Sequence, residues 1–104
     1  MTEKRKPTYS LDETKRLILE EKTLDPPLGV KETTNGMCLT IFEAYQEILE
    51  LRPSDFCKSM TDYHNHKVWQ DVYKKKIKGI SVYIKFKTFD GKFLLTSFKP
   101  DESG

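Results

Sequence analysis

A lysine and a glutamine that could hold a phosphate group lie in two neighbouring segments of this sequence. Residues 55–61 read DFCKSMT and contain Lys58, and residues 69–73 read WQDVY and contain Gln70. Both segments are typical of β-strands because β-branched and aromatic residues alternate with polar ones. If the two strands are neighbours, Lys58 and Gln70 lie on adjacent backbones, together with several hydroxyl groups. The sequence therefore predicts a polar site on a sheet.

Four strands are predicted in the second half of the chain, at about residues 55–63, 67–75, 80–88 and 92–99, and short linkers make them antiparallel neighbours. The third strand has the clearest period of two, which predicts one buried face and one wet, basic face that carries a tyrosine. Its apolar members are Ile80, Val82, Ile84 and Phe86, and they alternate with Ser81, Tyr83, Lys85 and Lys87.

The length of the last hairpin loop decides which residues share a face. A two-residue loop at Asp90 and Gly91 would pair Tyr83 with Phe98 and place Lys99 in the core. A three-residue loop at residues 89–91 instead pairs Ser81 with Lys99, Tyr83 with Ser97 and Val82 with Phe98. We predict the second register because it leaves Lys99 in solvent, as a diagonal neighbour of Tyr83.

Two helices are predicted in the first half. Ser10 and Glu13 have the S-x-x-E spacing of a capping box, so a helix starts after Ser10 and ends near Lys22, ahead of two prolines. Apolar residues at helical spacing from Cys38 to Leu49 predict a second helix, capped by residue 34 or 35 and ended by Pro53. Residues 23–35 show no steady period and are interpreted as an ordered loop, with room for a short strand.

These elements predict a single α+β domain over residues 1–104, with an antiparallel sheet of about four to six strands and two main helices on one face. No apolar run is long enough to span a membrane and the N-terminus lacks a signal peptide, so we expect a cytoplasmic protein. Cys38 and Cys57 lack CxxC spacing, which favours free thiols.

The chain carries a net charge of +2, with an uneven distribution. Residues 1–57 have eight Lys or Arg and eleven Asp or Glu, whereas residues 58–99 have ten Lys and three Asp. A basic face around a tyrosine suits an RNA backbone with an exposed base, because lysines neutralise phosphates and aromatic rings stack on bases. The same pattern is also typical of an ordinary solvated strand face.

His64 and His66 form an H-x-H pair. Two histidines could begin a metal site, but no third ligand is evident, and we predict no metal and no cofactor. One imidazole could instead act as a general acid or base in phosphoryl transfer.

The order of the motifs resembles the MqsR toxin family. That family shows DFYKSMT, HxxWQDVY, VYLK and VSFK, and this chain has DFCKSMT, HKVWQDVY, VYIK and TSFK in the same order. The likeness continues at Glu3, Lys4, Arg5 and Pro7 and at the GMC of residues 36–38. Four departures occur: Cys57 stands where the family has tyrosine, Thr96 replaces an aliphatic residue, the last hairpin is one residue longer, and residues 23–35 do not match the helical segment usual there.

The resemblance implies a RelE-like fold and a sequence-specific, ribosome-independent mRNA endonuclease. Its partners would be mRNA and a cognate antitoxin with a zinc-binding domain and a helix-turn-helix domain. The family's functional positions fall on Lys58, Gln70, Tyr83 and Lys99, which we expect to be catalytic. Further RNA contacts are expected from Lys85, Lys87, His66 and Tyr73.

The implied reaction is metal-free attack of a ribose 2′-hydroxyl on the adjacent phosphorus. Lys58 and Lys99 would stabilise the charge, Gln70 would position the phosphate, and Tyr83 or a lysine with a lowered pKa would transfer protons. Crowded lysines are expected to lower one another's pKa. The alternative from another class is a non-catalytic module that binds single-stranded RNA. Only the enzyme would produce new RNA ends.

Overall fold

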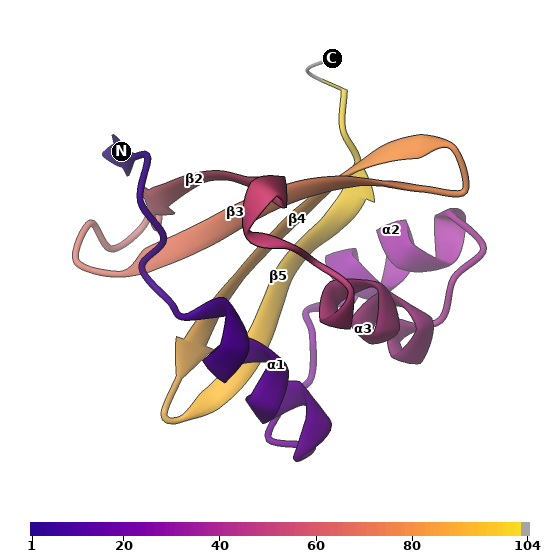
Figure 1. Cartoon of the computed structure of the whole chain (residues 1–104), viewed down its shortest axis with the longest axis horizontal. Coiled ribbons are helices and arrows are strands. Elements are labelled where there is room, and N and C mark those ends of the chain that lie inside the picture. Colours follow the sequence, from indigo (N-terminus) through magenta and orange to yellow (C-terminus); the bar gives the residue numbers. More distant parts are fainter. Residues whose placement is uncertain (103–104) are drawn as a thin grey trace.

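The computed structural model describes residues 1–102 and shows three helices and a five-stranded antiparallel sheet with strand order β1-β2-β3-β4-β5 (Figure 1). The strands are β1 (Glu3–Lys4), β2 (Phe56–Thr61), β3 (Trp69–Ile77), β4 (Ile80–Phe89) and β5 (Lys92–Pro100). The helices are α1 (Leu11–Leu19), α2 (Leu28–Gly36) and α3 (Ile41–Leu49), and a 3₁₀ turn, η1 (Pro53–Asp55), leads into β2. The predicted α+β class is confirmed, and the closer RelE-like assignment stays a prediction.

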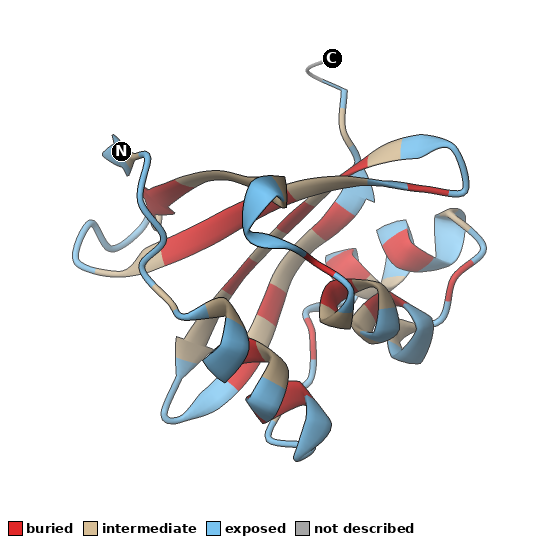
Figure 2. Ribbon diagram, viewed as in Figure 1, coloured by how far each residue is buried: buried red, intermediate tan, exposed pale blue. Residues whose placement is uncertain are grey.

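All three helices lie on one side of the sheet (Figure 1). The core between the two layers is built from alternate residues of the long strands and from the apolar stripes of the helices, so buried and less buried positions alternate along β4 (Figure 2). Its fully buried aromatic rings are Tyr73, Phe86, Phe93 and Phe98. In residues 1–102 no helix has both the length and the apolar character needed to cross a membrane.

Helix starts follow local capping chemistry. Ser10 caps α1 as predicted, with its hydroxyl accepting from the Glu13 backbone N–H at 3.2 Å. The predicted cap of the next helix was wrong: Thr40 caps α3 in a reciprocal capping box with Glu43. Cys38 lies before this helix and has a left-handed φ of 61°. The predicted helix therefore began about one turn too early.

The loop predicted at residues 23–35 is wrong for most of its length, because residues 28–36 form α2. This helix buries only Val30 and Thr34, and the Thr33 hydroxyl donates to the Phe98 carbonyl oxygen on β5 at 2.8 Å. Glycine, threonine and asparagine are weak helix formers, so tertiary contacts rather than propensity stabilise α2. Thr23 makes an isolated bridge to Phe93, which is the trace of the short strand considered there.

The predicted register of the last hairpin is also wrong. Phe89 pairs with Lys92 across a two-residue turn in which Asp90 and Gly91 both have positive φ. A bulge at Thr96 then shifts the pairing by one residue, so Tyr83 lies directly opposite Lys99. The reason for rejecting a plain two-residue hairpin was sound, since Lys99 stays out of the core. The extra residue simply lies in the strand instead of the loop.

Asp71 attaches the N-terminal segment to the sheet. Its carboxylate is fully buried and accepts the backbone N–H groups of Thr8, at 3.0 and 3.1 Å, and of Tyr9, at 2.9 Å. The Tyr9 hydroxyl donates to the Trp69 carbonyl oxygen at 2.6 Å. These bonds direct the chain from the sheet edge at β1 to the start of α1.

Replacing Asp71 with asparagine is expected to reduce the free energy of unfolding by about 1–3 kcal/mol, because the amide offers one acceptor oxygen in place of two to the partly buried N–H groups of Thr8 and Tyr9. Urea denaturation would measure this change. Asp90→Asn in the exposed hairpin turn is the matched control. Equal urea midpoints for the two variants would show that Asp71 does not anchor the segment.

Candidate active site

The sheet surface opposite the helices carries most of the residues predicted to be functional. We call this surface the open face. Its members alternate with core residues along the strands, and pairing aligns them across the sheet: Lys58 and Lys85 lie on either side of Val72, and Tyr83 lies between Lys74 and Lys99. The residues with predicted roles on this face are Lys58, Gln70, Tyr83, Lys85, Lys87 and Lys99.

A bulge in β2 turns Lys58 toward the open face. Phe56 pairs with Tyr73 and packs against the core, and in a regular strand Lys58, two residues later, would face the same way. The extra residue, Cys57, reverses this alternation.

Tyr83 is half-buried at the centre of this arrangement. Its hydroxyl lies 3.7 Å from the Met60 sulfur, and the Lys99 ammonium lies 5.5 Å from the ring centroid. Burial raises the pKa of Tyr83, and the charges of Lys58 and Lys74 partly oppose this shift. The phenol therefore keeps its proton at neutral pH and is a hydrogen-bond donor.

Two lysines of the open face, Lys58 and Lys85, have pKa values shifted in opposite directions. The hydrogen bond from Lys58 to Glu3, 2.7 Å long, raises the pKa of Lys58, contrary to the expectation that crowding lowers it. Burial, followed by the charge of Lys99, lowers the pKa of Lys85. Lys58 is therefore a permanent cation, and Lys85 is the lysine whose neutral form is more accessible than in a free side chain.

Gln70 lies on the open face with only 6% of its surface exposed. Its side-chain oxygen accepts a hydrogen bond from the Thr96 hydroxyl, and the same hydroxyl lies 3.1 Å from the Lys85 carbonyl oxygen. Thr96 is the bulged residue of β5, so the irregularity of the hairpin also orients the glutamine. With the oxygen engaged, the amide nitrogen is the end that can donate to a substrate.

Lys87 reaches the face but is paired with Asp62 of the β2–β3 loop at 3.2 Å. His66 lies exposed in that loop, and within residues 1–102 it shares no hydrogen bond or ion pair with the open-face residues. The described part of the chain contains no cluster of three or more His, Cys, Asp or Glu side chains suited to a metal ion.

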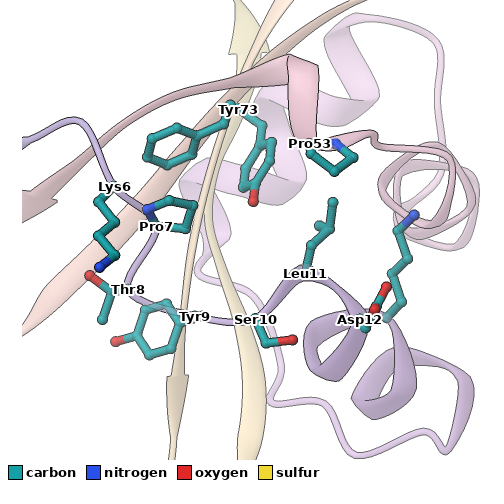
Figure 3. A pocket seen from close by; sticks show the side chains of 11 residues that line it. Lys6, Pro7, Thr8, Tyr9, Ser10, Leu11, Asp12, Pro53 and Tyr73 are labelled. Atoms are coloured by element: carbon teal, nitrogen blue, oxygen red, sulfur yellow. The ribbon is translucent and has the colours of Figure 1, made fainter.

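Tyr73 does not reach the open face. It is 1% exposed and stacks on Phe86 in the core, with ring centroids 5.5 Å apart. Its hydroxyl borders a pocket of about 600 Å³ between η1 and the N-terminal segment (Figure 3). The pocket is lined by Lys6, Pro7, Thr8, Tyr9, Ser10, Leu11, Asp12, Lys15, Pro53, Phe56 and Tyr73. The prediction of Tyr73 as an RNA contact placed it on the wrong side of the sheet, because WQDVY has buried residues on both faces.

A hollow of about 390 Å³ adjoins Tyr83 at one end of the open face. It is lined by Tyr83, Lys99, Pro100, Asp101 and Glu102. Asp101 closes it by extending the pairing of β5, with its N–H donating to the Ser81 carbonyl oxygen at 2.8 Å. The hollow combines an aromatic ring, a cation and carboxylates, which are groups that can contact a nucleotide.

The sequence-based prediction missed the acidic partners of these lysines. Glu3 pairs with Lys58, Asp62 with Lys87, and Asp101 with Lys74 at 3.2 Å. Glu3 lies on the edge strand β1, and Asp62 and Asp101 follow the last residues of β2 and β5. No periodicity signals such contacts, because Glu3 and Lys58 are 55 residues apart in the chain.

Comparisons with known proteins agree with the motif order. Residues 6–100 match the family model described as "Motility quorum-sensing regulator, toxin of MqsA". The chain is also 36% identical over 103 residues to a protein of Escherichia coli (strain K12) named mRNA interferase toxin MqsR, and the match covers 93% of this chain and 97% of that protein. A match over nearly the whole of both chains shows the family: this chain belongs to the MqsR toxins.

Proposed function

We propose that this chain is an endoribonuclease toxin that cleaves mRNA at specific sequences, without a ribosome and without a metal ion. The observation that carries the proposal is the gathering of Lys58, Tyr83, Lys85 and Lys99 on one open face, where cations surround a half-buried phenol. The name of the Escherichia coli relative, an mRNA interferase toxin, supports RNA as the substrate.

The proposed reaction is an in-line transfer within the RNA strand. The 2′-hydroxyl oxygen bonds to the adjacent phosphorus while the bond from phosphorus to the 5′-oxygen breaks. A base removes the proton of the 2′-hydroxyl, and an acid gives a proton to the departing 5′-oxygen. The products are a 2′,3′-cyclic phosphate and a 5′-hydroxyl end, so no water is consumed in this step.

The directions in which the pKa values of the side chains are shifted suggest their roles. Lys58 and Lys99 stabilise the negative charge that develops on the phosphorus oxygens, since cations aimed at developing charge lower the barrier. Tyr83 is the acid because its raised pKa keeps it protonated. Lys85 is the base because burial lowers its pKa, which makes its neutral amine more accessible than that of a free lysine.

Binding and positioning fall to the neighbouring residues. The Gln70 amide nitrogen donates to a phosphate oxygen from within the face, held in place by Thr96. Lys87 and His66 extend the basic surface along the RNA, with Lys87 released from Asp62 when a phosphate takes its place. We do not assign an RNA contact to the buried Tyr73.

The proposal includes a partner and a compartment. A cognate antitoxin with a zinc-binding domain and a helix-turn-helix domain would inhibit the toxin in the cytoplasm. The family description names the toxin of an antitoxin, MqsA, and leaves the type of antitoxin open. Mixing the purified toxin with the product of an adjacent small reading frame that encodes CxxC pairs would test inhibition directly.

The decisive experiment is incubation of the purified protein with a defined mRNA in EDTA and in the absence of ribosomes. We expect cuts at a small set of sequences, with 5′-hydroxyl ends located by primer extension. RNA that stays intact at a large excess of protein, yet shifts in a binding gel, would instead support the non-catalytic RNA-binding module.

A further inference from the structure

The ion pair between Glu3 and Lys58 places a carboxylate on the open face. Glu3 pairs with Met60 in the antiparallel β1–β2 ladder, and its carboxylate oxygen lies 2.7 Å from the Lys58 ammonium. Lys58 is one of the cations proposed to hold the scissile phosphate. A carboxylate and a phosphate compete for the same N–H donors of an ammonium group.

Two other lysines of this face also have carboxylate partners, but those partners are held more firmly. The Asp62 carboxylate also accepts the His64 backbone N–H at 3.1 Å and so shapes its loop. The Asp101 side chain is only 6% exposed. The Glu3 side chain is 51% exposed, and Lys58 is its hydrogen-bond partner among the described residues.

The backbone that carries Glu3 is fixed independently of its carboxylate. Thr2 and Thr61 exchange hydrogen bonds beside it, with the Thr61 N–H donating to the Thr2 carbonyl oxygen at 2.8 Å. On the other side, the Lys4 ammonium lies over the Trp69 ring at 4.3 Å. The side chain of Glu3 can therefore swing away from Lys58 while β1 stays paired.

We infer that the Glu3 carboxylate occupies the phosphate subsite at Lys58 in the free protein, and that an RNA phosphate displaces it. The inference rests on the proposed function and adds a residue that limits affinity for single-stranded RNA. In the absence of RNA, Glu3 keeps Lys58 charged and orients it toward the face. When RNA binds, the phosphate takes over both tasks, and the Glu3 side chain moves into solvent.

The test is RNA binding by Glu3→Gln, measured by fluorescence anisotropy. The probe is a short 2′-O-methyl RNA copied from a site that the wild-type protein cleaves, since it binds without reacting. Because the phosphate no longer has to break an exposed ion pair, we expect binding about two- to fivefold tighter.

Two controls separate competition at Lys58 from a general change of charge. Glu32→Gln removes the same charge from exposed α2, on the helix side of the sheet, and should leave the affinity unchanged because the charge is screened at that distance. In a Lys58→Ala background, Glu3→Gln should give no tightening, because the contested cation is gone.

Each outcome supports or overturns either the inference about Glu3 or the proposed function. Tightening by Glu3→Gln that disappears without Lys58 supports the inference. Unchanged or weaker binding, or equal tightening by Glu32→Gln, overturns it while leaving the nuclease proposal intact. A wild-type protein that leaves mRNA intact at a large excess overturns the proposed function itself, whether or not it binds the RNA.

Discussion

Replacing Lys85 with arginine is expected to lower the rate constant of RNA cleavage about 100-fold or more while RNA binding stays close to that of the wild type. Arginine keeps the positive charge and the contact with the backbone, but it does not give up its proton in a protein. The neutral amine of Lys85 is what the proposed mechanism needs to accept the 2′-hydroxyl proton. The change should therefore appear in kcat and not in KM.

The pH dependence of cleavage provides a second measure of the same role. The pKa of Lys85 is lowered, so its neutral fraction grows as the pH rises, and the wild-type rate should increase about tenfold per pH unit until that pKa is approached. Tyr83 and Lys58 keep their protons over the same range because their pKa values are raised. Lys85→Arg should lose this increase.

Lys92→Arg is the matched control for this substitution, since Lys92 is exposed at the start of β5, next to the hairpin turn. It should keep both the wild-type rate and the wild-type pH profile. If Lys85→Arg also kept the full rate and the rise with pH, another group would have to be the base.

Truncating Lys58 to alanine is expected to reduce kcat about 100- to 1000-fold, because the charge on the phosphorus oxygens loses a cation that is already oriented. Lys58→Arg should recover part of the activity, since the charge is restored on a side chain of different shape. Lys58 is 28% exposed and pairs with an exposed carboxylate, so neither change should unfold the protein. Single-turnover kinetics at saturating protein would separate the chemical step from binding.

The outcome against this assignment is a Lys58→Ala variant within about threefold of the wild-type rate. Circular dichroism spectra that match the wild type would show that any larger loss comes from the site and not from misfolding. Lys15→Ala offers a comparison, because Lys15 lies on α1, on the helix side, where its ammonium donates to the Leu51 carbonyl oxygen.

Much of the fold follows from local rules. Alternation from Val82 to Phe86 correctly predicted which side of β4 is buried, although Ile80 at the start of the strand is exposed and not buried as predicted. The Ser10 cap correctly predicted the start of α1. These predictions succeeded because a strand period or a cap is determined by residues a few positions apart. The same rules did not predict α2, because residues such as Gly29 and Thr33 have weak helix propensity and packing on β5 stabilises the helix.

The identities of the candidate functional residues could be predicted from the sequence, but their orientation could not. Motif order predicted Lys58, Gln70, Tyr83 and Lys99, and the structure places all four on the open face. Two bulges that the sequence did not reveal orient them: Cys57 turns Lys58 outward, and Thr96 brings Tyr83 opposite Lys99. A bulge is invisible to a period-two pattern until the pairing of the neighbouring strand is known.

By itself the sequence determined the residue types, the strands that carry them and the family to which their order belongs. Only the tertiary structure decided the directions of their pKa shifts and the carboxylates with which the lysines pair. The hydrogen bond to Glu3 raises the pKa of Lys58, whereas burial, followed by the charge of Lys99, lowers the pKa of Lys85. The physical reason is that a pKa depends on burial and on charges a few ångströms away, and these neighbours come from distant parts of the chain.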